Sequence, residues 1–265
     1  MMRLFCFSDI HGQGWAFDKI MDFINSQSQN EEVKVFFLGD ACDRGPDGYR
    51  IMNTMLDDER FIYIKGNHED MFVNAAREFL DMCFKEYWLS PSELYKTFQE
   101  NIIELMYQGE NMKLYLSNGG APTFEDWIKD GARRSFVNKI SNLEEATVAE
   151  IYFPIYVNYD MCHAGCLKEE WNSDNNYNSL LWNRTHFWQD WEEGRILIHG
   201  HTPVRSREIR ALHERHPKSI ERPCWYANNT KLDIDTGVFV SGVIYLFDMI
   251  EQKFIEFRVD SNEKE

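Results

Sequence analysis

Three short polar segments near the start of the chain carry side chains that could do chemistry. They read Ser8-Asp9-Ile10-His11-Gly12, Gly39-Asp40-Ala41-Cys42-Asp43-Arg44-Gly45 and Gly66-Asn67-His68-Glu69. Two later segments add histidines, in Cys162-His163-Ala164-Gly165 and His199-Gly200-His201-Thr202-Pro203. Carboxylate, imidazole and amide groups bind divalent metal ions, and a mixed oxygen and nitrogen set favours Mn, Fe or Zn over a calcium cage or a thiolate zinc site. Two such ions about 3.5–4 Å apart can activate a bridging water and stabilise an in-line phosphoryl displacement.

The elements expected around the first three segments explain how these side chains could meet. Residues 3–66 alternate apolar runs and amphipathic stretches, which predicts strands at 3–8, 33–38 and 61–65 and helices at about 15–26 and 47–57. This βαβαβ order favours a largely parallel sheet with right-handed crossovers. Each polar segment follows one of the strands. Because the carboxyl ends of parallel strands meet at one edge of the sheet, we expect the ligands to converge there.

The rest of the chain divides into a helical part and a β-rich part. A helix is expected after Asn67, and residues 88–150 are predicted to be wholly helical, with capping-box patterns at Ser90 to Glu93 and Ser141 to Glu144. We interpret 88–150 as an insertion over one edge of the site. Strands are expected at 152–162, 195–199, 232–235, 238–247 and 252–258. These predict a second sheet, stacked on the first, in one domain of residues 1–265 with a solvated tail at 261–265.

Composition limits the class of protein. With 265 residues, of which 43% are hydrophobic, the chain can bury a large core, so a disordered chain is excluded. A net charge of −16 repels polyanions, so nucleic acid is not an expected partner. No apolar run reaches the roughly twenty residues that a membrane span needs. The six cysteines form no Cys-x-x-Cys pair, which favours free thiols and a cytoplasmic location.

The five motifs, in their order, resemble those of the calcineurin-like metallophosphoesterases. They are Asp-x-His-Gly, Gly-Asp-x-x-Asp-Arg-Gly, Gly-Asn-His-Glu, His-Ala-Gly and Gly-His-Thr-Pro-Val, between residue 4 and about residue 248. The match is closest to the phosphoprotein phosphatases in their bacterial and phage branch. The resemblance implies an α/β fold of four layers, αββα, with two mixed sheets flanked by helices.

The resemblance also implies two metal sites, with Mn the expected ion and Fe or Zn as alternatives. Asp9, His11 and Asp40 would hold one ion, and Asp40 would bridge to a second ion held by Asn67, His163 and His201. The wider superfamily often ends the last motif Gly-His-x-His, so that a second histidine joins the first ion. Here Thr202 and Pro203 follow His201, which is typical of the phosphoprotein phosphatases.

The remaining motif residues match the groups that handle phosphate and proton in this family. His68 resembles the general acid that protonates the leaving alkoxide after a metal-bridging hydroxide attacks phosphorus, and Asp43 would keep it charged and oriented. Arg44, together with Arg184 in Leu181-Trp182-Asn183-Arg184, resembles the pair of arginines that clamps phosphate, a role suited to a planar charged fork.

Three functions remain open from the sequence. The first is a Ser/Thr protein phosphatase acting on a phosphorylated protein or a small phosphoester. The second is a symmetrical diadenosine tetraphosphate hydrolase, which usually has Asp where this chain has Glu69. The third, a catalytically silent binding module, is disfavoured because no ligand is missing. The physiological substrate and the oligomeric state are not predicted.

Several other features allow two interpretations. His199 is more simply an internally bonded core histidine than a ligand, and Glu69 could be structural or functional. The aromatic residues Trp182, Phe187, Trp188 and Trp191 favour core packing over base stacking. The basic segment 205–222 fits a solvated loop, or a surface that recruits an anionic substrate.

Overall fold

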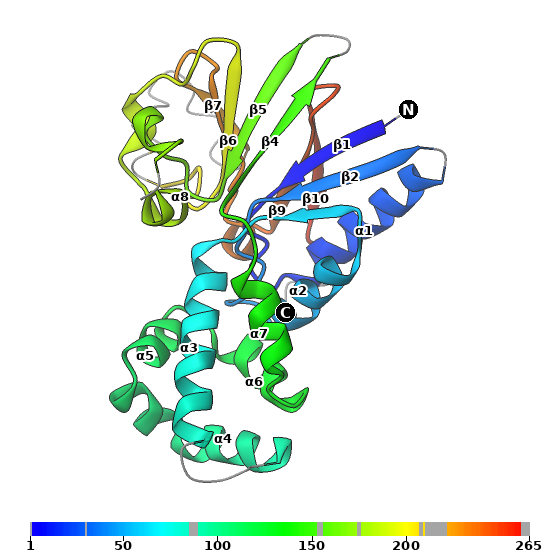
Figure 1. The fold of residues 1–265 in the computed structure, drawn as a ribbon. Coiled ribbons are helices and arrows are strands. Elements are labelled where there is room, and N and C mark those ends of the chain that lie inside the picture. The colour runs from blue at the N-terminus through cyan, green and yellow to red at the C-terminus, as the bar shows by residue number, and fades with distance from the viewer. Residues whose placement is uncertain are drawn as a thin grey trace.

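Two five-stranded β-sheets form the body of the protein (Figure 1). The computed structural model describes residues 2–29, 31–84, 90–152, 156–173, 176–206, 209 and 222–260. The first sheet has the order β10-β9-β1-β2-β3 and the second the order β4-β5-β6-β8-β7. Helices flank both sheets, as expected for the four-layer α/β fold.

The first sheet contains the predicted parallel strands. β1 (Met2–Phe7), β2 (Glu32–Phe37) and β3 (Phe61–Tyr63) run parallel, with Phe7 beside Phe37 and Phe37 beside Tyr63. β9 (Val243–Asp248) pairs antiparallel with β1, and β10 (Lys253–Arg258) pairs antiparallel with β9. The βαβαβ prediction is therefore confirmed, and it brings the three polar segments to one edge.

The second sheet is also mixed. β5 (Val157–Cys162), β6 (Arg195–His199) and β8 (Lys231–Asp233) are parallel neighbours, so the His163 and His201 segments leave adjacent strands. β4 (Ala146–Ile151) and β7 (Cys224–Tyr226) close the two edges in antiparallel pairing. The two ligand-bearing loops of this sheet are thereby placed side by side.

Successive side chains of β1 pack alternately against the helices on one face and against the second sheet on the other. Phe5 and Phe7 of β1 join a buried cluster that includes Phe17 and Ile20 of the first helix. Cys6, between them, belongs to a second cluster, in which the two sheets meet. This period of two is what a strand buried on both faces requires.

Helices cover the sheets and extend beyond them. α1 (Gly14–Ser28) and α2 (Gly48–Asp57) lie along the first sheet, and α8 (Tyr177–Trp182) lies beside the second (Figure 1). α3 (Asn67–Phe84), α4 (Pro91–Gln108), α5 (Glu110–Ser117), α6 (Ala121–Lys129) and α7 (Arg134–Ser141) project below the sheets. Two 3₁₀ turns cover Lys168–Glu170 and His186–Trp188.

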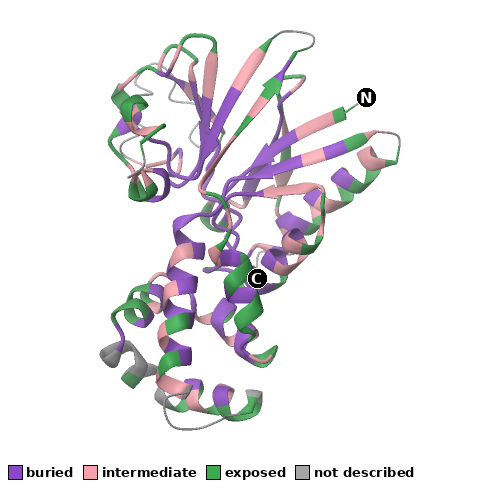
Figure 2. Cartoon of the chain, viewed as in Figure 1, coloured by how far each residue is buried: buried purple, intermediate pink, exposed green. Residues whose placement is uncertain are grey.

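An aromatic core holds the projecting helices together. The Phe72 ring of α3 lies edge-on to Trp127 of α6 at 5.6 Å and to Phe136 of α7 at 5.8 Å. These residues are buried in the same cluster as the helix side of the first sheet. Figure 2 shows buried stretches along the projecting helices, in purple. At the start of α4, Ser90 Oγ accepts from Glu93 N at 3.4 Å while the Glu93 carboxylate accepts from Ser90 N at 2.7 Å, so this capping box is confirmed.

Two predicted elements differ in the structure. Residues 146–151 are strand β4 and not helix, and α7 ends at Ser141, so no helix starts at the second capping-box pattern. The backbone of Lys65 donates to Glu144 O at 2.8 Å, which draws this segment toward the sheets. Residues 238–241 form a short helix, α10 (Val238–Ser241), because Gly237 and Gly242 on either side take φ values of 61° and 65°. The strand expected at 238–247 therefore begins only at Val243, as β9.

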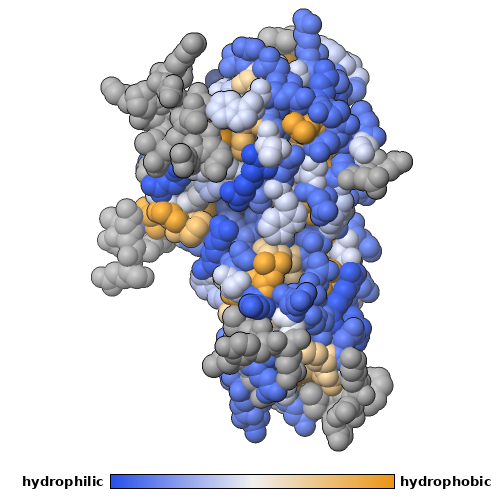
Figure 3. Space-filling model, turned by 90° about the vertical axis from the view of Figure 1, so that its left-hand side faces the viewer, coloured by the Kyte–Doolittle hydropathy of each residue, from blue (hydrophilic) through white to orange (hydrophobic). Residues whose placement is uncertain are grey.

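The surface carries no continuous apolar band on the face drawn in Figure 3, where hydrophobic atoms form separate patches on a hydrophilic background. Within the described ranges, no helix has the length and hydropathy needed to cross a bilayer. All six cysteines are free, and five are buried, as predicted. The tail 261–265 and residues 207–208 and 210–221 of the basic segment lie outside the described residues.

Candidate metal centre

The loops after the strands hold an unusual backbone. Six residues singled out in the sequence have left-handed φ values between 45° and 70°, although none is glycine: Asp9, His11, Asp40, Asp43, Arg44 and His201. Such values cost about 1–3 kcal/mol per residue and persist only where surrounding contacts enforce them, typically at functional sites. The strain turns these side chains away from regular strand directions.

Glycines let the loops approach one another closely. A Cβ on Gly39 would lie 2.5 Å from Cα of Gly66, and a Cβ on Gly12 would lie 2.5 Å from the carbonyl oxygen of Gly45. Each pair joins two of the three opening motifs. The glycines in those motifs are thus explained by the close contact of the backbones that carry the polar side chains.

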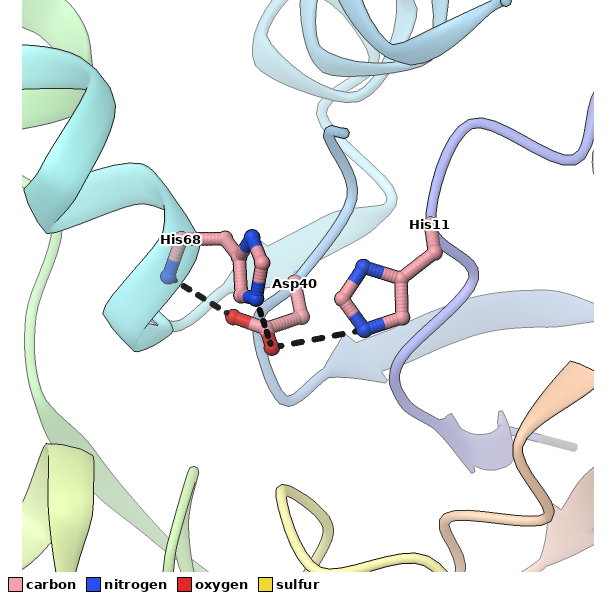
Figure 4. A group of neighbouring side chains, drawn as sticks. All are labelled: His11, Asp40 and His68. Carbon is pink, nitrogen blue, oxygen red and sulfur yellow. Dashed lines mark hydrogen bonds and ion pairs between the residues drawn. The ribbon is translucent and has the colours of Figure 1, made fainter. Parts of the chain in front are cut away.

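The first donor group consists of His11, Asp40 and His68, whose ligand atoms all lie within 4.8 Å of one another. Figure 4 shows the three side chains turned toward one point from the loop after β1, the loop after β2 and the start of α3. Asp40 Oδ2 lies 3.6 Å from His11 Nε2 and 3.8 Å from His68 Nε2. The backbone N–H of His68 donates to Asp40 Oδ1 at 3.0 Å, which fixes the carboxylate.

The second donor group shares Asp40 and adds His163 and His201. Asp40 Oδ1 lies 3.3 Å from His163 Nε2. Asn67 Oδ1 lies 2.9 Å from His163 Nε2 and 2.8 Å from His201 Nδ1, so the amide joins the same group. Asp40 is therefore common to both groups, at the place where the sequence predicted a bridge.

Asp9 is buried beside these groups but belongs to neither. Its two carboxylate oxygens each accept from the backbone N–H of His201 at 3.1 Å, and Ser8 Oγ donates to one of them. Burial and the negative charge of Asp235 raise the pKa of Asp9. The carboxylate thus lies next to the donor cluster, with its oxygens turned to a backbone group of the last motif.

The donor chemistry fits divalent cations. His11 Nδ1 and His163 Nδ1 bond to backbone carbonyls, of Cys42 at 3.0 Å and Leu38 at 2.7 Å, which leaves each Nε2 facing Asp40. This outward hydrogen bond is the usual support of metal-binding histidines. Burial would lower the pKa of His163, but the carboxylates of Asp40 and Asp9 outweigh it and raise that pKa to about 10. The carboxylates of Asp40 and Asp9 therefore favour a positive charge at the position of His163.

His11 and His201 are suited to bind a metal ion as neutral ligands. Burial, followed by the charge of His163, lowers the pKa of His201 to about 2, and burial lowers the pKa of His11 well below its usual range. Burial opposes ionisation of Asp40, yet the imidazoles of His163 and His68 bring its pKa well below the usual value. Neutral imidazoles at His11 and His201 and an ionised Asp40 are the protonation states that metal binding needs.

His68 has a second partner that matches its predicted role. Its Nδ1 lies 2.7 Å from Asp43 Oδ2, and both side chains are buried. Burial lowers the pKa of His68, but Asp40 and Asp43 together raise it above the ordinary value of 6.5. The proton on Nδ1 is then directed at Asp43, and Nε2 faces Asp40 within the first donor group.

Two exposed arginines border the cluster. The Arg44 guanidinium lies 2.9 Å from His11 Nε2 and 3.1 Å from His68 Nε2. Arg184 Nε lies 3.3 Å from His201 Nε2, from the opposite donor group. The structure therefore brings together all of the site residues named from the sequence, with the candidate metal donors buried and two exposed arginines beside them.

The sequence profile described as Calcineurin-like phosphoesterase matches residues 2–233, which is most of the chain. The protein belongs to the calcineurin-like phosphoesterase family. Members of this family are metal-dependent hydrolases, so this phosphoesterase is one as well. The family predicted from five motifs is thus confirmed.

Individual relatives of this phosphoesterase are more distant. A Caenorhabditis elegans protein, named as a proposed serine/threonine-protein phosphatase, is 29% identical over 128 residues, which cover 46% of this chain and 27% of the relative. The chain therefore matches only about a quarter of that relative's length.

Solved structures support the fold. The structure of a proposed diadenosine tetraphosphatase has a TM-score of 0.51 at 13% identity, over 98% of this chain and 94% of that one. A cold-active protein-tyrosine phosphatase of a Shewanella species has a TM-score of 0.51 at 16% identity, over 97% and 77%. At these identities the likeness concerns the fold alone.

Two aromatic residues at the phosphoesterase site were missed in the sequence. The Phe239 ring of α10 lies under the Arg44 guanidinium, 4.6 Å from ring centroid to Cζ, and edge-on to His11 at 5.8 Å. Trp182 is 39% exposed and lies edge-on to His201 at 6.0 Å. Core packing therefore holds for Phe187 and Trp191 but is wrong for Trp182 and for Trp188, which is 72% exposed. Only the position of Trp182 two residues before Arg184 pointed to the site.

Two further residues receive a structural explanation. His199 bonds internally, to Gly200 O at 3.0 Å and to the Tyr226 hydroxyl at 2.5 Å, as predicted. Glu69 is fully buried, and its carboxylate accepts from the backbone N–H groups of Asp40 at 2.8 Å, Ala41 at 2.7 Å and Gly66 at 2.8 Å. The hydroxyl of Tyr63 donates to it as well, at 2.9 Å. Glu69 thus holds the loop that carries Asp40 in place.

Replacement of Glu69 by glutamine is expected to destabilise the phosphoesterase. The amide NH₂ would face backbone N–H donors, and each buried donor left without an acceptor costs about 1–3 kcal/mol. We expect the free energy of unfolding, measured by urea denaturation, to fall by about 2–4 kcal/mol. The exposed Glu59 offers a control, because Glu59→Gln removes a charge without removing a buried acceptor. Equal stability of the two variants would show that Glu69 does not brace the loop.

Proposed function

We propose that this phosphoesterase hydrolyses phosphomonoesters with two divalent ions, Mn in the first instance, and that phosphorylated serine or threonine side chains of proteins are its substrates. One observation carries the proposal. Two buried donor groups share Asp40, and one exposed arginine borders each group. A phosphoryl group is the ligand that needs both a pair of cations beneath it and planar donors at its edge.

The donors of the cluster suit such ions. Asp40, with His11 and Asp9 on one side and Asn67, His163 and His201 on the other, would hold the pair. When bound, the two ions would supply an activated water and offset the negative charge on the attacking and departing oxygens.

The protein's own side chains carry out the remaining steps. Arg44 and Arg184 bind and orient the phosphoryl oxygens from opposite sides of the donor cluster. His68 Nε2 gives its proton to the oxygen of the leaving alkoxide, which is too basic to depart unprotonated at neutral pH. Asp43 accepts from His68 Nδ1 at 2.7 Å, so it keeps the imidazolium charged and the ring in position.

A side-by-side assay tests this function. Mn-loaded protein is given a phosphoserine peptide, para-nitrophenyl phosphate and diadenosine tetraphosphate, and kcat/KM is measured for each. We expect hydrolysis of the two monoesters and a preference for them over the dinucleotide. A preference for diadenosine tetraphosphate would instead support the alternative polyphosphate hydrolase, and no turnover of any of the three would support a silent binding module.

A further inference from the structure

Helices α5 and α6 and the turn between them form hydrogen bonds to the loop that carries Asp43 and Arg44. The Tyr115 hydroxyl donates to Asp43 Oδ1 at 2.6 Å. The backbone N–H of Asp43 donates to Thr123 Oγ1 at 3.0 Å, and the backbone N–H of Arg44 donates to Gly119 O at 3.0 Å. Residues about seventy to eighty positions later in the chain therefore supply three hydrogen bonds to two adjacent residues of the site.

Close packing holds the residues that form these hydrogen bonds in place. Tyr115 and Thr123 are both fully buried, and a Cβ on Gly120 would lie 2.4 Å from the Tyr115 ring. The Tyr115 ring also contacts Phe72 and Phe124 of the aromatic core, at 5.9 and 5.8 Å between centroids. The hydroxyl thus has a fixed position relative to the helical core.

The loop that carries Asp43 and Arg44 needs contacts from other segments to keep its conformation. Asp43 and Arg44 have φ values of 70° and 65°, a conformation that side chains other than glycine rarely adopt. The Asp43 carboxylate is fully buried and uses one oxygen for His68 and the other for Tyr115. Without the Tyr115 hydroxyl, Oδ1 would lose the partner that stops the carboxylate from rotating away from the imidazole.

We propose that Tyr115 is a positioning residue, and that the helical insertion serves to hold the Asp43–His68 pair in its reactive geometry. The inference rests on the proposed function, in which His68 protonates the leaving group. Tyr115 would act on the proton donor, His68, through Asp43. Gly119 and Thr123 would hold the backbone of Asp43 and Arg44.

The test compares substrates that differ in their need for a proton. A serine alkoxide must be protonated as it leaves, whereas 2,4-dinitrophenolate is a weak base and leaves without a proton. In Mn-loaded Tyr115→Phe, we expect kcat for a phosphoserine peptide to fall about 10- to 100-fold, the effect of one hydrogen bond to a charged group. We expect kcat for 2,4-dinitrophenyl phosphate to fall less than about threefold and KM to stay unchanged for both.

Three further variants sharpen the comparison. Tyr95→Phe removes a hydroxyl from α4 of the same insertion, where it contacts Glu125 at 3.4 Å, and should change neither substrate's turnover. Thr123→Val removes the acceptor for Asp43 N–H and should reproduce the selective loss, even if Tyr115→Phe folds poorly. Added to His68→Asn, Tyr115→Phe should cause no further loss, because its target is already gone.

The outcomes separate the two proposals. Equal losses on both substrates in Tyr115→Phe and Thr123→Val, or a further loss on top of His68→Asn, would overturn the positioning role and leave the proposed function intact. Failure of the unsubstituted protein to hydrolyse either substrate would overturn the proposed function, and the role of Tyr115 with it.

Discussion

Replacement of His68 by asparagine is expected to lower kcat for a phosphoserine peptide by about 10²–10⁴-fold, the usual contribution of a general acid. The effect follows from the geometry, because Nε2 lies within the first donor group, 3.8 Å from Asp40 Oδ2, while Asp43 bonds the other ring nitrogen at 2.7 Å. Asparagine offers no proton of suitable acidity. Stopped-time phosphate release at saturating substrate measures the change.

The pH dependence of kcat gives a second measure of His68. Its pKa is raised above 6.5 by Asp40 and Asp43, and the protonated form is the active one, so activity is lost as the pH rises through that pKa. His68→Asn should abolish this alkaline decline. Metal content, measured by mass spectrometry, should match that of the unsubstituted protein. A variant that keeps full turnover with a normal metal content would refute the assigned role.

The largest effect is expected for Asp40→Asn. Both donor groups contain this carboxylate, so its loss would weaken both of the proposed metal positions at once. We expect kcat/KM to fall by at least about 10³-fold, since metal ions contribute several kcal/mol of transition-state stabilisation. The measurements are kcat/KM and the number of ions retained after dialysis.

A neighbouring carboxylate provides the control for Asp40. Asp70 lies one turn into α3, where it bonds to Asn74 and Tyr177 and reaches none of the donors. Asp70→Asn should therefore retain its ions and most of its activity. Similar losses in both variants would indicate a general effect of charge near the site, and would argue against a bridging role for Asp40.

The predictions that succeeded rested on local signals. Apolar runs ending in Asp9, Asp40 and Asn67 marked three parallel strands, and the topology then brought those residues to one edge. The motif glycines Gly39 and Gly66 were readable as close-approach positions only once the two loops were seen in contact. Motif order predicted the family and the fold, because it records a three-dimensional arrangement along the chain.

The failures had one local cause, at residues 238–241, and two causes in contacts between segments separated along the chain. Val238, Phe239 and Val240 have strand propensity, yet flanking glycines with positive φ turn them into one helical turn. Residues 146–151 become a strand because β5 pairs with them from Val157 to Cys162. Tyr115 bonds to a residue 72 positions away, and nothing in its own surroundings in the sequence indicates that contact.

Electron paramagnetic resonance of Mn-loaded protein tests whether two metal ions share Asp40, as we propose. We predict two Mn ions per chain by mass spectrometry and the exchange-coupled spectrum of a bridged pair, reduced to at most isolated ions in Asp40→Asn. A single Mn per chain, or two ions with uncoupled spectra in the unsubstituted protein, would show that Asp40 does not join two ions.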